Sequence, residues 1–470
     1  MPEENKPLEI VIVGLGASGL YASKSALSFN RNCRVTIVER RNFDQFSPCG
    51  LPFVLEGVVK DFDALKHTVP EVKNKLAKLI NHEVVAVDAE QKTVTALDRD
   101  SGKQKVLRYD ALILATGATP VNLPIPGAAE FVGRGVHFVS DIDNSCALLE
   151  AARAARRKRA VVVGGGAIGL EVAVGLRAIG LEVAVTKRTP PPFPRNLDPE
   201  MGALIVAQLE RLGIRVLFGK GIDRIDGNGQ VESVEIAGET LACDIVVMAV
   251  GMRANIKLAE QLGARIENGL VAVDNRMQTS VKDVFATGDL VQTYSRIDRS
   301  PTVMQLATSA YRQGMAAGVN AAGGDTPYPG ALNTFLTAVG PLQVAGTGYT
   351  LETARKLGYE ARAISTKSEI KPHYIPGAKE IHLRVIVDTT CGKILGAQAV
   401  GEEGAGWRVN IFALAIHGGM TLYDLIDAEL AYYPGESQMY DPISQVVEIG
   451  LKRLKLPYRE CALVFFPENR

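Results

Sequence analysis

The sequence predicts an α/β protein in which two domains of the same parallel-sheet type are followed by a C-terminal α+β domain. Three observations support this fold class. The chain has 470 residues, which is too long for one ordinary hydrophobic core. A strand–glycine turn–helix–strand pattern occurs twice, at Gly14 and at Gly164. After Gly330, apolar and polar residues alternate, which is typical of antiparallel strands.

The composition excludes several classes of protein. Hydrophobic residues make up 47% of the chain and charged residues 22%, and Lys plus Arg and Asp plus Glu both number 52. With a net charge of zero, we expect no nucleic-acid partner and no binding to an anionic membrane. The start, MPEENKPLE, is not typical of a signal peptide, and no stretch is apolar enough to span a bilayer. The six cysteines show neither a CxxC pair nor metal-ligand spacing, so we expect no metal site and a reducing cytoplasm.

The first repeated unit reads LEIVIVGLGASGLYASKSALSFNRNCRVTIVER from Leu8. Its apolar run over 10–13 predicts a buried parallel strand, which a glycine turn, a helix and a second strand over 34–38 then follow. The second unit, residues 158–188, repeats this order. Further strands are predicted within residues 111–120, 244–255 and 282–291.

Both glycine turns fit the GxGxxG pattern. The glycines are Gly14, Gly16 and Gly19 in the first turn and Gly164, Gly166 and Gly169 in the second. Glycine at these positions allows a tight turn, lets backbone N–H groups approach a pyrophosphate and lets the helix pack closely on the strand. One copy alone also fits a glycine-rich loop of another α/β fold. Two copies, each within a complete βαβ unit, favour two Rossmann-like nucleotide-binding domains.

The second strands of the two units end differently. Glu39 ends the first one, where a carboxylate accepts hydrogen bonds from ribose hydroxyls. Lys187 and Arg188 end the second one, and two cations attract a 2′-phosphate. We interpret this pair as a preference for NADPH over NADH. The alternative is two solvated surface charges beside a site that does not discriminate.

The segment FSPCGLP contains a lone cysteine, Cys49. Its neighbours along the sequence are Cys33 and Cys146, so no second thiol is close in the chain. A lone cytoplasmic cysteine is most often buried and inert. The other interpretation is a redox-active thiol that takes its partner sulfur from a substrate.

Taken together, the motifs GLGASG…E, ATGATP, GGGAIGLE, AVGMRAN and FATGDL resemble those of the flavoprotein pyridine nucleotide–disulfide oxidoreductases. The resemblance covers nearly the whole chain. It implies an FAD-binding domain in two parts, residues 1–122 and 253–330, an NAD(P)H-binding domain over 123–252, and a C-terminal dimerisation domain over 331–470. The residues that would line FAD are Gly14, Gly16, Gly19, Glu39, Thr116, Gly117, Gly288 and Asp289. Those that would line NADPH or NADH are Gly164, Gly166, Gly169, Glu171, Lys187, Arg188 and Gly251.

The chain is similar to the single-cysteine branch of that family. It lacks the CxxxxC pair, and the tail segment LAYYPGESQMYDPIS, residues 430–444, contains no histidine. This branch includes coenzyme A disulfide reductases, CoA-persulfide and polysulfide reductases, and NADH oxidases and peroxidases. The resemblance implies that Cys49 is the redox-active residue, which receives electrons from NADPH through FAD. We expect a helix that opens around Gly50 to lower the pKa of the Cys49 thiol.

Tyr432 matches the active-site tyrosine that the partner subunit supplies in this branch, so the resemblance also implies a homodimer. Its hydroxyl would donate a proton to a leaving sulfur in place of the missing histidine. Tyr433 and Tyr440 are alternatives for this role, and the sequence does not separate them from packing aromatics.

Several residues depart from the patterns of the branch. Ala17 stands where oxidases and peroxidases place a histidine, and Pro48 stands where coenzyme A disulfide reductases usually carry an asparagine. Only Lys24 and Arg31 offer positive charge on the first helix for the phosphates of coenzyme A. In the tail, Gly435 and Glu436 replace a proline and a phenylalanine, and a carboxylate there disfavours an anionic substrate.

We therefore expect an FAD-dependent NAD(P)H oxidoreductase that reduces a disulfide, persulfide or polysulfide at Cys49, with a small thiol such as coenzyme A as its partner substrate. The alternative is an NAD(P)H oxidase, or a flavoprotein that passes electrons to a protein partner without needing Cys49. A redox sensor is a third interpretation, but no DNA-binding motif is present to act as its output.

Overall fold

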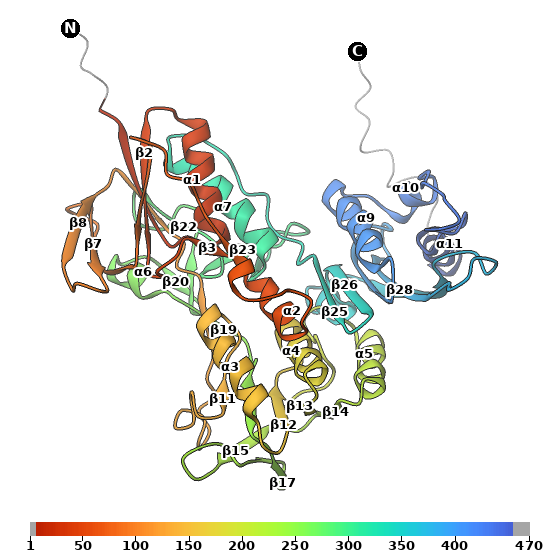
Figure 1. Ribbon diagram of the computed structural model, residues 1–470. Helices are drawn as coiled ribbons and strands as arrows, with labels where there is room; N and C mark the ends of the chain where they lie inside the picture. The colour runs from red at the N-terminus through yellow and green to blue at the C-terminus, as the bar shows by residue number, and fades with distance from the viewer. Residues whose placement is uncertain (1–5, 455–470) are drawn as a thin grey trace, which may run out of the picture.

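The computed structural model describes residues 6–454 (Figure 1). The first parallel sheet has the strand order β22-β9-β1-β2-β5, and all neighbouring strands in it run parallel. Its strands are β1 (Leu8–Val13), β2 (Cys33–Glu39), β5 (Leu76–Ile80), β9 (Ala111–Leu114) and β22 (Val284–Ala286). Residues 10–13 and 111–114 are buried, as expected for parallel strands that are covered on both faces.

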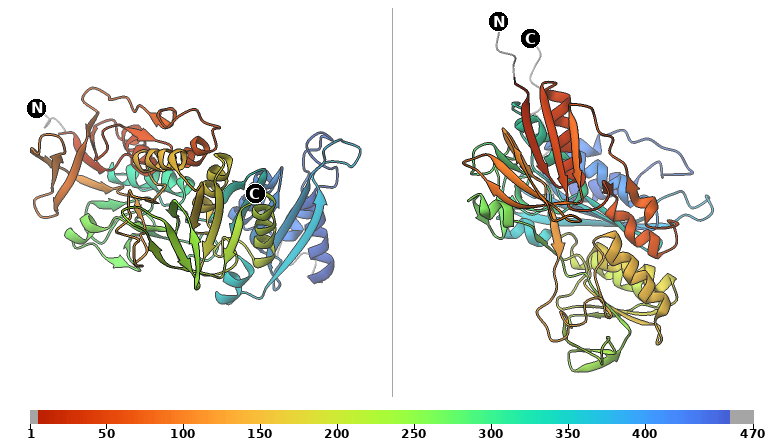
Figure 2. Two further views of the ribbon diagram at one scale, coloured as in Figure 1. Left: turned by 60° about the horizontal axis from the view of Figure 1, so that its bottom comes forward. Right: turned by 60° about the vertical axis from the view of Figure 1, so that its left-hand side comes forward.

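Two helices, α1 (Ala17–Phe29) and α7 (Ala307–Ala321), pack against each other beside this sheet, as the two views in Figure 2 also show. Gly314 and Gly318 of α7 permit the close approach. A Cβ atom at either position would collide with a backbone oxygen of α1, that of Ser18 or of Ala22. The helix that begins at the first glycine turn is therefore held tightly by a segment almost three hundred residues later in the sequence.

The second parallel sheet has the order β11-β18-β12-β13-β14 and is also parallel throughout. Its strands are β11 (Val136–His137), β12 (Arg159–Val163), β13 (Glu182–Lys187), β14 (Arg215–Phe218) and β18 (Ile245–Met248), and its helices are α3 (Ile142–Ala154), α4 (Ala167–Ala178) and α5 (Pro199–Arg211). In both sheets the strand before the glycine turn lies between the strand after the helix and a strand from later in the unit. The repeated sequence pattern thus produces a repeated topology.

A two-stranded antiparallel ladder, β10 (Ala118–Pro120) with β19 (Met252–Ala254), connects the two parallel-sheet domains where the chain leaves the first and returns to it. Smaller sheets are β3 (Gln45–Phe46) with β4 (Lys66–His67); β6 (His82–Asp88), β7 (Thr93–Asp98) and β8 (Gln104–Arg108); β15 (Ile222–Asp226), β16 (Ser233–Ile236) and β17 (Glu239–Ala242); and β20 (Ile266–Glu267), β21 (Leu270–Ala272), β23 (Val291–Tyr294) and β24 (Pro301–Thr302). Short helices are η1 (Pro48–Gly50), α2 (Leu51–Leu55), η2 (Asp63–Leu65) and α6 (Lys257–Gln261).

The C-terminal domain is built on an antiparallel sheet of order β25-β26-β29-β28-β27, which confirms the expected antiparallel strands. Its strands are β25 (Phe335–Val339), β26 (Leu342–Gly348), β27 (Ala361–Glu369), β28 (Glu380–Asp388) and β29 (Ile394–Gly401), and its helices are α8 (Leu351–Lys356), α9 (Ala405–Gly418), α10 (Leu422–Ile426) and α11 (Pro442–Leu454). Helix α9 packs on β26 and β29, with α10 and α11 at the outer end of the domain (Figure 1).

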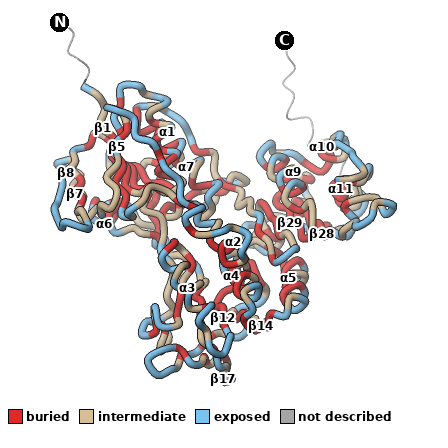
Figure 3. The backbone as a smooth tube through the Cα atoms, viewed as in Figure 1, coloured by how far each residue is buried: buried red, intermediate tan, exposed pale blue. Residues whose placement is uncertain are grey.

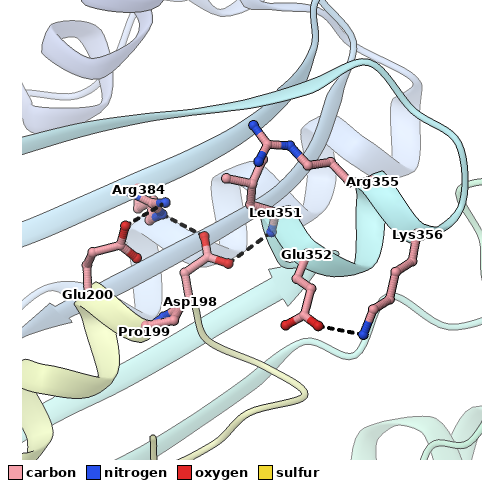
Figure 4. A pocket seen from close by; sticks show the side chains of 8 residues that line it. All are labelled: Asp198, Pro199, Glu200, Leu351, Glu352, Arg355, Lys356 and Arg384. Atoms are coloured by element: carbon pink, nitrogen blue, oxygen red, sulfur yellow. Dashed lines mark hydrogen bonds and ion pairs between the residues drawn. The ribbon is translucent and has the colours of Figure 1, made fainter.

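The C-terminal domain meets the second domain through aromatic stacking and an ion pair. The rings of Phe193 and Phe335 stack with centroids 5.7 Å apart. Nearby, Asp198 accepts a hydrogen bond from Nε of Arg384 at 2.6 Å and from the backbone N–H of Leu351 at 2.9 Å (Figure 4). Buried residues run continuously through this junction (Figure 3), so the two domains share part of one core.

Each of the three further runs predicted to contain a strand does so, but each strand is shorter than its run. Residues 111–120 and 244–255 each divide into two strands, and the run over 282–291 forms β22, after which Gly288, with φ of +91°, turns the chain before β23 begins. The exact domain boundaries stay predictions. Within residues 6–454, no helix is both long and apolar enough to cross a membrane.

Candidate active site

The first glycine turn has the shape of a pyrophosphate cradle. Gly14 has φ of +104°, and a Cβ atom there would collide with the backbone oxygen of Ala115, while one at Gly19 would collide with the oxygen of Gly14. At Gly16, by contrast, a Cβ atom would meet nothing within 4 Å. Gly16 also precedes α1, and no side chain caps the N–H groups at the start of that helix. The two tight glycines shape the turn, and the open one leaves room for a ligand.

The second glycine turn has the same design. Gly164 (φ +135°) lies against the backbone oxygen of Ala249, and Gly169 lies against Gly164. Gly166 is open and precedes α4 without a side-chain cap. Two turns of matching geometry therefore fit two dinucleotides, as the sequence predicted.

Glu39 has partners within the protein that the sequence did not reveal. Its carboxylate is buried and accepts a hydrogen bond from the N–H of Leu15 at 2.7 Å, and Arg41 forms an ion pair with it at 2.8 Å. Glu39 therefore fixes the first glycine turn to the end of β2. Its predicted bond to a ribose stays a prediction.

Several polar groups around Asp289 have no partner among the described residues. Burial raises the pKa of the Asp289 carboxyl to about 6. Close by, the hydroxyl of Thr287 and Nε2 of Gln313 are buried without a hydrogen bond, although Oε1 of Gln313 accepts one from the N–H of Gly288 at 2.9 Å. Buried polar groups normally have a partner, so this cluster fits a ligand rich in hydroxyls such as FAD.

Thr116 and Gly117 are held by Asn255, a residue that the sequence analysis did not select. The hydroxyl of Thr116 donates to the backbone oxygen of Asn255 at 2.8 Å, and Nδ2 of Asn255 donates back to the oxygen of Thr116. The N–H of Asn255 also donates to Gly117. These hydrogen bonds join the two chain segments that connect the first and second domains. Gly251, whose φ is +113°, lies in the second of these segments.

The two cations at the end of β13 behave differently. Lys187 turns back onto its own loop and donates to the hydroxyl of Thr189 at 2.6 Å, and burial lowers the pKa of the Lys187 ammonium. Arg188 is exposed. Of the predicted pair, Arg188 is thus the side chain that is free to meet a phosphate.

Cys49 lies in the single-turn helix η1, on a segment that is anchored on both sides. The β3–β4 ladder closes the base of the segment, and the hydroxyl of Ser47 lies 2.7 Å from Nε2 of His67. After Cys49, α2 buries Leu51 and Leu55 in the core shared with the second domain. Cys49 itself is exposed at the tip of this rigid segment.

The polypeptide raises the pKa of the Cys49 thiol, so the expected lowering by a helix is wrong. The largest cause is burial of part of the residue, and the carboxylates of Glu171 and Asp289 add to it, while a backbone hydrogen bond lowers the pKa by less. The physical reason is that burial of the sulfur and the carboxylates of Glu171 and Asp289 together outweigh the backbone hydrogen bond, which is the one contribution that favours the thiolate.

Glu171 belongs to the surroundings of the cysteine as well as to the predicted nucleotide site. It lies on α4 and accepts a hydrogen bond from the hydroxyl of Thr337 on β25 at 2.5 Å. Burial raises the pKa of its carboxyl, the bond from Thr337 lowers it, and Glu56 raises it further. Glu171 thus brings negative charge from the second domain next to Cys49, in contact with the C-terminal domain.

Tyr432 lies in the segment between α10 and α11, two helices that Figure 1 shows at the far end of the C-terminal domain from α2. Its hydroxyl is exposed and lies 3.4 Å from that of Tyr374, and this hydrogen bond raises the pKa of Tyr432. Tyr374 is a further candidate for the proton-donor role, which sequence reasoning missed. Tyr433 is exposed, and the hydroxyl of Tyr440 donates to Glu448.

The other departures also have defined places. Ala17 is the first residue of α1 and Pro48 the first of η1, while the ammonium of Lys24 lies 5.4 Å from the ring centroid of Tyr21. Within residues 6–454 no cluster of His, Cys, Asp or Glu has an arrangement suited to a metal ion.

Comparison with known proteins gives consistent matches over most of the chain. The family model for pyridine nucleotide-disulphide oxidoreductases matches residues 8–314, and the model for the dimerisation domain of these enzymes matches residues 335–441.

Two relatives and one solved structure show the extent of the similarity. An NADH oxidase of Methanocaldococcus jannaschii is 34% identical over 450 residues, which cover 95% of this chain and 99% of that protein. An NAD(P)H coenzyme A polysulfide/persulfide reductase of Pyrococcus horikoshii is 32% identical over 94% of this chain and 98% of its own. The structure of an NAD-dependent persulfide reductase from A. fulgidus matches with a TM-score of 0.90 and 29% identity, over 95% of this chain and 84% of that one.

Replacing Glu171 with Gln tests the electrostatics of the cysteine. Because the Glu171 carboxylate raises the Cys49 pKa, we expect Glu171→Gln to lower it and to speed alkylation near neutral pH by about threefold. The measurement is the rate of iodoacetamide labelling of Cys49 against pH. Glu210→Gln is the matched control, because the exposed Glu210 contributes neither to the shift at Cys49 nor to the shift at Glu171. An unchanged pH profile in Glu171→Gln would contradict this assignment.

Proposed function

The chain belongs to the pyridine nucleotide-disulphide oxidoreductase family, and we propose that it reduces a disulfide, persulfide or polysulfide through the single sulfur of Cys49. As a member of this family it is an FAD-dependent NAD(P)H oxidoreductase. The first glycine turn and the unpartnered polar groups around Asp289 would hold FAD, which would supply the redox chemistry that carries two electrons from NAD(P)H to the sulfur.

The exposure of Cys49 carries this proposal. Among the described cysteines, Cys33 and Cys243 are buried and Cys146 and Cys391 are half-buried, whereas Cys49 is exposed on a segment anchored in two domains. A structural cysteine is normally buried, while a reactive one is accessible. Two further facts support a sulfur substrate: one similar protein is named a coenzyme A polysulfide/persulfide reductase, and one similar structure is that of a persulfide reductase.

The chemistry needs one sulfur from this chain and one from the substrate. The Cys49 thiolate attacks R–S–S–R′, so that a Cys49–S–S–R bond forms and R′–S⁻ leaves. R′–S⁻ takes up a proton, for which we propose the hydroxyl of Tyr432 from the partner subunit as donor. Two electrons then cleave the mixed disulfide, which restores the thiolate and releases R–SH after a second protonation. The sum is one NAD(P)H, one proton and one disulfide converted to NAD(P)⁺ and two thiols.

We further propose that the nucleotide is NADPH in preference to NADH and that Arg188 provides the preference. An exposed guanidinium at the end of β13 can pair with a 2′-phosphate through two hydrogen bonds, which an ammonium cannot do with the same geometry. Lys187, which is tied to Thr189, shapes the loop that presents Arg188.

The proposed functional unit is a homodimer. Helix α9 exposes Trp407 and Leu414 seven residues apart, on one face, and β25 exposes Leu336 beside Gly406 of that helix. We call these three side chains, Leu336, Trp407 and Leu414, the association face. Large exposed apolar side chains that lie together are typical of a subunit interface, and the family's dimerisation-domain model matches this part of the chain.

An NAD(P)H oxidase is the second candidate, because the M. jannaschii relative is named an NADH oxidase. The geometry favours it less, since Ala17 puts no hydrogen-bonding group at the start of α1 to control an oxidised Cys49. Oxygen consumption without added acceptor distinguishes the two candidates.

Removing the sulfur tests the main proposal. We expect Cys49→Ser to keep its FAD and its reduction by NADPH, while anaerobic turnover with coenzyme A disulfide or polysulfide falls by about a thousandfold or more. Stopped-flow absorbance separates flavin reduction from turnover. Cys146→Ser is the control and retains turnover. Full activity of Cys49→Ser would instead support an electron-transfer flavoprotein in which the cysteine is incidental.

Removing the guanidinium tests the nucleotide preference. Loss of a charge-assisted bond to phosphate in Arg188→Ala is expected to raise KM for NADPH about tenfold and to leave KM for NADH nearly unchanged. Arg224→Ala, which removes another exposed arginine of the same domain, should change neither constant. Equal losses for both nucleotides would assign Arg188 a structural role.

A charge on the association face tests the homodimer. Leu414→Glu places a carboxylate where we expect apolar burial, so the protein should sediment as a monomer at concentrations at which the unmodified chain is a dimer. Flavin content should be retained, because α9 does not line the glycine turns. The control is Leu357→Glu, a charge at an exposed leucine outside the association face. A stable Leu414→Glu dimer would place the interface elsewhere.

A further inference from the structure

The segment that carries Tyr432 has no regular structure of its own. Residues 427–441, which we call the tyrosine segment, join α10 to α11 and lie wholly within the described part of the chain, yet contain neither helix nor strand. Such a segment keeps its position only through contacts with neighbouring elements. Those contacts therefore decide where Tyr432 lies.

A buried ion pair holds the end of this segment. Asp441 accepts hydrogen bonds from Nε of Arg408 at 3.1 Å and from Nη2 at 2.6 Å. Both side chains are buried, and that of Arg408 is 0% exposed. Oδ1 of Asp441 also accepts a hydrogen bond at 2.9 Å from the N–H of Ile443, in the first turn of α11. One carboxylate thus fixes the boundary between the tyrosine segment and α11.

The arginine is itself held firmly on α9. Its Nη1 donates to the backbone oxygen of Gly404 at 3.2 Å, and its guanidinium lies 4.1 Å from the ring centroid of Trp407. Gly404 leaves the space for this, since a Cβ atom there would collide with Nη1. The planar guanidinium is therefore fixed in position and direction before it meets Asp441.

The other hydrogen bonds between the tyrosine segment and neighbouring elements are weaker than this ion pair. Nε2 of Gln438 donates to the backbone oxygen of Glu369 at 2.6 Å, and both residues are near the surface. The bond between Tyr432 and Tyr374 is long, at 3.4 Å, and exposed. Hydrogen bonds in contact with water contribute little net stability, so the buried pair is the main polar anchor, beside the packing of Leu430 against the core of the domain.

We propose that Arg408 is a positioning residue for Tyr432, which it acts on through Asp441. A buried ion pair adds little stability compared with two apolar side chains of the same volume, but its paired bonds fix direction, which apolar contacts do not. Because Trp407 covers the guanidinium and belongs to the association face, the helix that meets the second subunit also places the tyrosine. This inference rests on the proposed role of Tyr432.

The test is Asp441→Asn in the full-length holoenzyme. We expect amide exchange across residues 427–441, followed by mass spectrometry, to rise about tenfold, and kcat with the disulfide acceptor to fall about tenfold. Reduction of the flavin by NADPH should keep its rate. Because Asp441 acts through Tyr432, Asp441→Asn should cause no further loss in a Tyr432→Phe background.

Two further variants separate positioning from stability. Asp198→Asn weakens another buried ion pair with an arginine and should leave exchange of the tyrosine segment unchanged. If single replacements fail to fold, Arg408→Met combined with Asp441→Leu removes both charges without leaving one unpaired, and should fold while showing the same rise in exchange and fall in kcat.

Unchanged exchange across the tyrosine segment in Asp441→Asn would overturn the inference. A loss of kcat that adds fully to that of Tyr432→Phe would do the same, since it would show a general structural effect. If Tyr432→Phe alone keeps full turnover, the proposed role of Tyr432 fails, and the exchange measurement still decides whether Arg408 and Asp441 place the segment.

Discussion

The contact between α2 and α4 is the constraint on which the site depends. A Cβ atom at Gly175 of α4 would lie 2.9 Å from the Cβ atom of Leu55, so only glycine lets the cysteine-bearing segment lie this close. Helix α4 begins at the second glycine turn and carries Glu171 one turn further on. One rigid helix therefore fixes the distance between the expected nicotinamide nucleotide and the surroundings of Cys49. Interiors are packed like crystals, so a helix held in this way keeps its place.

The charges around the sulfur give the molecule a second constraint. The groups that shift the Cys49 pKa include two carboxylates, Glu171 and Asp289, and no cation. A thiolate is the reactive form of cysteine, so the protomer by itself disfavours the form that the proposed reaction needs. The compensating donors must then come from what binds next to Cys49. By thermodynamic linkage, a ligand that stabilises the Cys49 thiolate binds more tightly to the protein when Cys49 is ionised than when it is protonated.

How much of the structure could be predicted from the sequence depends on how far apart in the chain the interacting residues lie. The glycine turns could be predicted because GxGxxG is a local sequence pattern that determines local backbone geometry. The structure has this geometry at Gly14 and Gly164. Glu171–Thr337 joins residues 166 positions apart and Arg408–Asp441 joins residues 33 apart, with no periodicity to signal either pair. The direction of the Cys49 pKa was mispredicted for the same reason. A nearby helix can be inferred from sequence, but the burial of the sulfur and the carboxylates that are distant in the chain cannot.

A one-sulfur site has needs that a single protomer does not meet. Cys49 is exposed on a segment anchored between the first and second domains, whereas Tyr432 is exposed in the C-terminal domain, between α10 and α11. In two-sulfur chemistry, the second thiol would sit beside the first; in the proposed reaction the second sulfur comes from the substrate and the proposed proton donor from another chain. Association would then be part of the proposed catalytic geometry. A protein that depends on its partner for an acid would gain from having Trp407 and Leu414 of the association face on the same helix, α9, as Arg408, since no separate element must then transmit the position of one to the other.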